Sequence, residues 1–330
     1  MDLEKQSLRV GAAVILCALL LRLAAGGFFS PVVRLFSQPN IASLFIYLET
    51  GRIVRFSDSS GAATVFVPAA VTEPEETEPA AHPVFTAAEG QAVNIRGENL
   101  TENAGDLIRR PLHWDLTGEK PTVLIYHTHA TESYTPQPGE NYQESSPYRT
   151  LSDQYNMVSI GDRVAELLEA GGIKVIHDRQ LHDYPDYNTS YNSSRASVQS
   201  YLAQYPSIQL VLDIHRDASG DNNNQMTTSA TVDGKPSAQI MLVAAIGTDA
   251  RPVPRWRENL AMGLKLQTQL ERTAPGITRY VNLRGSRFNQ DLSPGAILVE
   301  IGAAGDTHEK AMRAAEVLAE AILALKHGAN

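Results

Sequence analysis

The fold is decided between residues 121 and 178, by PTVLIYH (121–127), SDQYNMVSIGDRVAELLEAGG (152–172) and IKVIHD (173–178). The first and last pieces are β-rich, and the middle piece places apolar residues at helical spacing. Ser152 is the expected N-cap of that helix, and Gly171 and Gly172 mark its expected end. A helix between two strands predicts a βαβ unit, the element from which parallel sheets are built.

Strand and helix patterns continue to alternate toward the C-terminus. Helices are predicted over 193–206, 255–276 and 307–327, and strands over 208–215, 277–283 and 295–302. The stretch MTTSATVDGKPSAQIMLVAAIG (226–247) predicts a hairpin that turns at Asp233 and Gly234. We therefore expect an α/β fold with a mixed, mostly parallel sheet and helices on both faces.

The N-terminal segment has the composition of a single transmembrane helix. VGAAVILCALLL (10–21) carries no charge and LAAGGFF (23–29) resumes the apolar run, which approaches the ~20 residues needed to cross a bilayer. Lys5 and Arg9 precede this span, so the positive-inside rule predicts a cytoplasmic N-terminus and an extracytoplasmic bulk. A cleaved signal peptide, with Ala24-Ala25-Gly26 at its cleavage site, and a buried core helix are the alternatives.

Composition divides the chain into an anchor (1–29), a juxtamembrane region with a Pro/Glu-rich linker (30–110) and an α/β domain (111–330). PAAVTEPEETEPAAHP (68–83) lacks large apolar side chains almost entirely, which predicts an extended tether. The net charge of −9 disfavours a nucleic-acid partner, since phosphate binding requires an excess of Lys and Arg. With one cysteine, Cys17, the chain forms no intrachain disulfide and no Cys-rich zinc site. His, Asp and Glu are left as ligands for any metal.

Three predicted strands end in side chains that bind metals or transfer protons. These side chains are His127, His129 and Glu132 in VLIYHTHATESY (123–134), Asp213, His215 and Asp217 in LVLDIHRDA (210–218), and Glu300 in AILVEIG (296–302). Ligand sites in open α/β sheets form at the carboxyl ends of strands. Imidazoles with one carboxylate are the zinc ligands of hydrolases, and a further carboxylate serves as general base. Strand alternation would place His127 and His129 on one face, so that both reach the site.

Four blocks carry a family resemblance: HTHATESY (127–134), DRQLHDYPDYNTSYNSSRASV (178–198), VLDIHRDA (211–218) and FNQDLSPGAILVEIG (288–302). In this order they resemble the stage II sporulation protein P family, which is related to the zinc-dependent N-acetylmuramoyl-L-alanine amidases. The resemblance covers roughly residues 121–327. It implies Zn²⁺ held by His127 or His129 together with Glu132 and His215, and Glu300 as catalytic base. Within the same blocks we assign three residues to substrate binding: Arg216, Asn289 and Gln290.

One departure from the amidase pattern leaves a ligand open. The ordinary amidases take their metal-binding glutamate from the start of the first helix, where this chain has Ser152 and Asp153. Glu132 is our choice for the carboxylate ligand, and Asp153 is the alternative.

The resemblance implies hydrolysis of peptidoglycan outside a membrane, at the amide between N-acetylmuramic acid and L-alanine, with an added endopeptidase activity on the stem peptide. It also implies thinning of the septal wall during engulfment of the forespore, in the intermembrane space of the sporulating cell. The implied partners are the stage II sporulation proteins D and M. A non-catalytic wall-binding protein with the amidase fold and a different zinc peptidase, such as a carboxypeptidase, are the alternative functions.

Overall fold

The computed structural model describes residues 53–56, 63–66, 85–86, 92–140, 142–221 and 224–329. The chain divides into two compact units, Met1–Glu75 and Glu76–Asn330. The described part of the first unit is an antiparallel pair, β1 (Ile53–Phe56) and β2 (Ala63–Phe66). The predicted anchor over residues 1–29 lies outside the described residues, and none of the described helices is long and apolar enough to cross a membrane.

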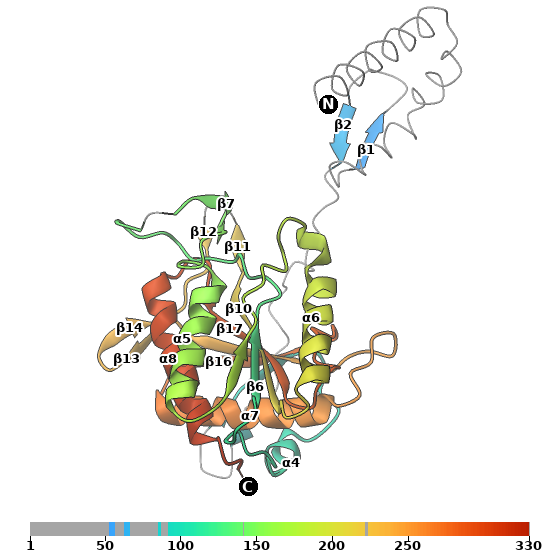
Figure 1. The fold of residues 1–330 in the computed structure, drawn as a ribbon, viewed down its shortest axis with the longest axis vertical. Helices are drawn as coiled ribbons and strands as arrows, with labels where there is room; N and C mark the ends of the chain where they lie inside the picture. Colours follow the sequence, from blue (N-terminus) through green and yellow to red (C-terminus); the bar gives the residue numbers. More distant parts are fainter. Residues whose placement is uncertain are drawn as a thin grey trace, which may run out of the picture. The chain divides into compact units, whose positions relative to one another are not determined.

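The second unit is built on a seven-stranded sheet (Figure 1). In spatial order its strands are β5 (Ile95–Gly97), β16 (Thr278–Arg284), β15 (Ile240–Ala245), β17 (Ala296–Ala303), β10 (Leu210–Asp217), β6 (Val123–Tyr126) and β9 (Val175–His177). All neighbours pair in parallel except β15 and β17, which are antiparallel. The prediction of a mixed, mostly parallel sheet is therefore confirmed. Strand β5 precedes residue 111, the boundary predicted for the α/β domain, and belongs to this sheet.

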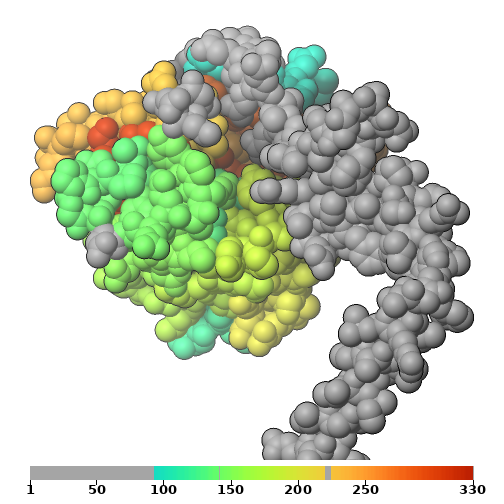
Figure 2. Space-filling view, turned by 90° about the horizontal axis from the view of Figure 1, so that it is seen from above, coloured from blue at the N-terminus to red at the C-terminus, as the bar shows by residue number. Residues whose placement is uncertain are grey.

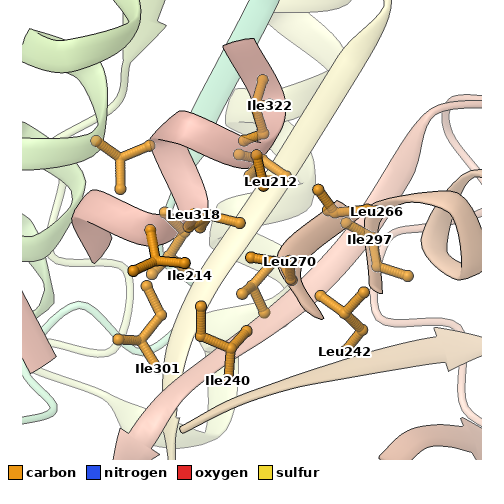
Figure 3. Packing of buried hydrophobic residues seen from close by; sticks show 14 of the residues in the cluster. Leu212, Ile214, Ile240, Leu242, Leu266, Leu270, Ile297, Ile301, Leu318 and Ile322 are labelled. Atoms are coloured by element: carbon orange, nitrogen blue, oxygen red, sulfur yellow. The ribbon is translucent and has the colours of Figure 1, made fainter. Parts of the chain in front are cut away.

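Helices cover both faces of the sheet, as predicted (Figure 1). The main helices are α5 (Met157–Ala170), α6 (Ser190–Gln204), α7 (Trp256–Thr273) and α8 (His308–Ala324). Leu212 and Ile214 of β10 point to one face and pack in the core cluster that α5, α7 and α8 share, as Figure 3 shows for α7 and α8. Val211, between them in alternation, joins the smaller cluster under α6.

Short elements complete the unit. They are β3 (Phe85–Thr86), β4 (Ala92–Val93), α4 (Ala104–Ile108), β7 (Glu144–Ser146), β8 (Arg149–Thr150), the 3-10 helix η1 (Tyr187–Thr189), β11 (Gly220–Asp221), β12 (Asn224–Gln225), β13 (Ala230–Val232) and β14 (Lys235–Ser237). The predicted turn is confirmed: β13 and β14 pair across Asp233 and Gly234, whose φ angles of 50° and 74° are the left-handed values of a tight hairpin turn. The hairpin is shorter than predicted, because the apolar run that follows it forms β15 and pairs with β16 and β17 in the main sheet.

Helix α5 begins later than predicted. Its N-cap is Asn156, whose side chain accepts a hydrogen bond from the Val158 N–H at 3.0 Å. Ser152, the predicted cap, instead closes a turn in which its carbonyl accepts from the N–H groups of Tyr155 and Asn156. Asparagine is as good an N-cap as serine, and the turn before it uses up residues 152–156. The predicted end is correct, since Gly171 is the C-cap.

Candidate active site

The candidate site lies at the carboxyl ends of β6, β10 and β17, three adjacent strands of the sheet. His215 on β10 is in register with Glu300 on β17. Partners in a parallel pair point to the same face, and neighbouring strands are about 4.8 Å apart. The sheet backbone thus places the predicted base, Glu300, beside the predicted ligand, His215.

Two residues from the loop after β6 complete this group. The His129 ring is perpendicular to the His215 ring, with 5.3 Å between the ring centroids. A carboxylate oxygen of Glu132, Oε2, lies 3.4 Å from His215 Nδ1. All three side chains are buried. The structure therefore brings together His129, Glu132, His215 and Glu300.

His127 does not join them. Strand β6 ends at Tyr126, and the chain enters a turn, so the alternation that predicted a shared face for His127 and His129 no longer applies. The His127 ring packs behind the site, where Nδ1 donates to the Ile214 carbonyl at 2.8 Å and Nε2 is 2.8 Å from His177 Nε2. Of the two candidate ligands, His127 and His129, the geometry therefore favours His129.

Asp153, the alternative carboxylate, is also placed elsewhere. Its side chain is about half exposed and forms an ion pair with Arg179 at 3.2 Å. Of the two candidates, Glu132 and Asp153, it is Glu132 that reaches His215. The geometry favours Glu132 for this role.

Asp213 belongs to the site as well, although our ligand assignment from the sequence omitted it. Its Oδ1 lies 2.9 Å from His215 Nε2. Thr128 fixes this carboxylate, because its N–H donates to Oδ1 at 2.8 Å and its hydroxyl to Oδ2 at 2.7 Å. The sequence contains a signal for this contact, since residues two apart on a strand share a face.

Two arginines neutralise Glu132. Arg149 Nη2 is 3.3 Å from Glu132 Oε1, and Arg216 Nη1 is 3.6 Å from the same atom. Burial would raise the pKa of Glu132, but Arg216, His215 and Arg149 outweigh it and hold the pKa below its ordinary value. Glu132 is therefore ionised, the form in which a carboxylate binds a metal.

The two histidines differ in charge. Burial lowers the pKa of His129 to about 3, so this ring is neutral at neutral pH and keeps a lone pair for a metal. Burial would also lower the pKa of His215, but Asp213 and Glu132 on either side of the ring raise it well above its usual value. The two carboxylates on either side of His215 make the surroundings of this ring favourable for a positive charge.

The donor set fits Zn²⁺ in kind. Imidazole nitrogens and a carboxylate oxygen are ligands that zinc uses. One buried ring atom, His129 Nδ1, has no hydrogen-bond partner, which is a cost unless something else satisfies it. Within the described ranges, no three His, Cys, Asp or Glu side chains are arranged as a metal-binding group.

The three residues assigned to substrate binding are all buried. Arg216 donates to the carbonyls of Ser133 and Tyr148 at 3.1 and 3.0 Å, so it braces the loops around Glu132. Asn289 Nδ2 donates to the Ser194 hydroxyl at 3.0 Å.

Gln290 is bound to the backbone of β15. Its side chain accepts from the Ala245 N–H and donates to the Val243 carbonyl, both at 2.9 Å. These contacts give Arg216, Asn289 and Gln290 internal partners, and the structure does not bring Gln290 to the group around His215.

The fold and the site together define a class, an α/β protein with a buried histidine–carboxylate centre at the carboxyl ends of adjacent strands. The model of the family described as Stage II sporulation protein P matches residues 60–323, and the chain belongs to that family. A relative of that description from Bacillus subtilis (strain 168) is 32% identical over 215 residues, which are 62% of this chain and 51% of the relative. The chain thus spans about half the length of this curated relative. The family resemblance is confirmed.

Solved structures with partial similarity include two amidases and a peptidase. The N-acetylmuramoyl-L-alanine amidase AmiC2 of Nostoc punctiforme is 16% identical, with a TM-score of 0.38 over 63% of this chain and 98% of that one. The CwlD amidase from Clostridioides difficile, solved with the GerS lipoprotein, is 14% identical, with a TM-score of 0.38 over 61% of this chain and 94% of that one. A metallo-carboxypeptidase from Burkholderia cenocepacia is 11% identical, with a TM-score of 0.33 over 78% of this chain and 66% of that one.

Proposed function

We propose that this protein is a zinc-dependent peptidoglycan hydrolase that cleaves the amide between N-acetylmuramic acid and L-alanine. The observation that carries the proposal is the group of His129, Glu132 and His215 with Glu300 in register beside His215. Membership of the stage II sporulation protein P family supports a peptidoglycan substrate and a role in sporulation.

The residues have distinct roles in this proposal. His129, Glu132 and His215 would hold the metal, which would supply Lewis acidity for the attacking water and the amide carbonyl. Glu300 takes a proton from the attacking water and delivers it to the amine of the departing L-alanine. Arg149 and Arg216 keep Glu132 ionised and fixed.

The cellular part of the proposal follows from the family. We place the domain outside the cytoplasmic membrane, held by the N-terminal helix, with the septal wall as its substrate during engulfment. Endopeptidase activity on the stem peptide and association with the stage II sporulation proteins D and M complete it. Fractionation tests the anchor: the full-length protein should remain in the membrane fraction after an alkaline wash.

The experiment that tests the chemistry is Glu300→Gln in the full-length protein, measured on purified sacculi. The amide is nearly the size of the carboxylate, so fold, zinc content and binding to sacculi should persist. Turnover should fall by about 10²–10⁴-fold, the usual contribution of general acid–base catalysis. Glu320→Gln, the same change at an exposed position of α8, is the matched control and should leave turnover unchanged.

Mass spectrometry of the released products separates the alternatives. Stem peptides with a free N-terminal L-alanine support the amidase. Release of free D-alanine instead would indicate a carboxypeptidase, and binding without any product would indicate a wall-binding protein. A zinc-loaded, folded Glu300→Gln protein with wild-type turnover would refute the role of Glu300.

A further inference from the structure

The large hydrophobic side chains that the described part of the chain leaves exposed gather on two segments. They are Leu151, 40% exposed, and Tyr184 and Tyr187, 54% and 39% exposed. Single exposed hydrophobic residues scattered over a surface are normal, whereas a cluster beside a site marks an interaction surface. We call these three side chains the apolar rim.

One arginine joins the two segments of the apolar rim. Arg149, two residues before Leu151, forms an ion pair from Nη1 to Asp183 Oδ2 at 2.7 Å, and Asp183 directly precedes Tyr184. The Arg149 guanidinium also lies over the Tyr187 ring, 4.7 Å from its centroid. Figure 2 shows the green surface around β7, β8 and α5 beside the yellow-green surface that leads into α6. These contacts fix the Tyr187 ring and join the two segments that carry Leu151 and Tyr184 before any ligand binds, which lowers the entropy cost of binding.

The apolar rim adjoins the candidate site. The Tyr187 ring stacks on the His129 ring, with 4.5 Å between centroids and 12° between planes. Arg149 also reaches Glu132 Oε1 at 3.3 Å. A ligand lying along the apolar rim therefore has one end at the residues that hold the metal in our proposal.

The charges around the apolar rim favour an uncharged ligand. Arg149 already faces two carboxylates, Asp183 and Glu132, so it has little attraction left for an acidic peptide. The exposed carboxylates of Glu144 and Asp186 flank the rim and would repel anionic lipids and the carboxylates of a stem peptide. Sugar rings are neutral, and their C–H faces pack on aromatic rings while their hydroxyls remain hydrated.

We propose that the apolar rim binds the sugar rings of the glycan strand next to the scissile amide, with Tyr184 as the ring on which a sugar stacks. This inference rests on the proposed function, because it takes the glycan to be attached to the amide. Tyr187 has His129 and Arg149 against its ring and serves as the support. Tyr184, more than half exposed, offers the accessible ring.

Binding to sacculi, measured with the full-length Glu300→Gln protein so that substrate is not consumed, tests the inference. Tyr184→Ala should weaken binding by roughly 3- to 10-fold, the size of an aromatic stacking contribution. Tyr184→Trp should restore it, and Leu151→Ala should weaken it in the same direction. Tyr205→Ala, which removes a ring at the other end of α6, is the matched control and should bind as tightly as the parent. In otherwise wild-type protein, Tyr184→Ala should raise KM and leave kcat and zinc content unchanged.

Competition identifies the ligand. Chitotetraose, a neutral sugar oligomer without peptide, should release the bound parent protein from sacculi. It should not release the Tyr184→Ala protein that remains bound. The inference is overturned if Tyr184→Ala binds sacculi as the parent does. It is also overturned if only a free stem peptide competes, or if Tyr184→Ala loses binding to phosphatidylglycerol vesicles but not to sacculi. Absence of product release by the wild-type protein would instead refute the proposed function, because binding is measured separately from cleavage.

Discussion

Replacing Gly161 with alanine probes the packing behind the site. A Cβ atom at this position of α5 would lie 2.4 Å from His177 Nε2 and 2.5 Å from His127 Nε2, well inside van der Waals contact. Each ring is held at its other nitrogen, since His127 Nδ1 donates to the Ile214 carbonyl at 2.8 Å and His177 Nδ1 contacts Asp162 Oδ1 at 3.0 Å. Neither ring can retreat from the new methyl group without losing one of these contacts.

The expected magnitude is the balance of three effects of Gly161→Ala. Alanine is favoured over glycine inside a helix by about 1 kcal/mol. Crowding in a packed interior costs about 1–3 kcal/mol, and losing the contact between the two imidazoles costs about 1 kcal/mol more. The free energy of unfolding should therefore fall by about 1–3 kcal/mol, which for a unit of this size lowers Tm by about 2–12 °C.

Urea denaturation and calorimetry of Gly161→Ala measure this loss, with His177→Ala as the reference. In the His177→Ala background the contact between the two rings is already lost and only the His127 ring crowds the new methyl group, so adding Gly161→Ala should cost less than it does in the wild type. A single Gly161→Ala protein as stable as the wild type, or more stable, would show that helix propensity dominates and that the two rings are not held as described.

Three further outcomes are expected. Arg216→Met leaves Glu132 buried beside one cation fewer, so the free energy of unfolding should drop by about 3–5 kcal/mol in urea titrations. A urea midpoint equal to that of the wild type would contradict the bracing role of Arg216. His215→Ala should lose zinc by metal analysis after dialysis, because it removes one of three protein ligands. Retained stoichiometric zinc would exclude His215 as a ligand. Burial alone would raise the pKa of Asp291. Its two hydrogen bonds to Arg195 lower the pKa by more than burial raises it, so the pKa in the folded protein is below the ordinary 3.8. The stability from this pair is complete above about pH 4 and lost as pH falls through the folded pKa, so the difference in Tm between wild type and Asp291→Asn should shrink in acid.

The central strands of the sheet were predictable because they contain apolar runs bounded by turn residues, whereas the three-residue strand β5 carries no such run and was not predicted. The apolar run before His215 and the one before Glu300 could be recognised without knowing their partners. Their order in the sheet and the antiparallel pairing of β15 with β17 depend on contacts between distant segments, which local patterns do not encode.

The site was predictable where strands fix the side chains and less so where a loop does. His215 and Glu300 lie on strands and occur where predicted. His127 and His129 straddle the end of β6, and alternation failed at the residue where the strand stops. The internal partners of Asn289 and Gln290, Ser194 and the backbone of β15, are remote in sequence, and no short motif announces them.

The register of β10 and β17 has a consequence for how the sequence of this protein can evolve. Since hydrogen bonds of the backbone set the separation of His215 and Glu300, the surrounding loops can lengthen, shorten or acquire new side chains without altering that separation. A single inserted residue within β17 is a different matter, because it would turn Glu300 to the opposite face and present an aliphatic neighbour, Val299 or Ile301, in its place. Inherited variation should therefore accumulate as insertions in the loops, while the length of this strand is preserved.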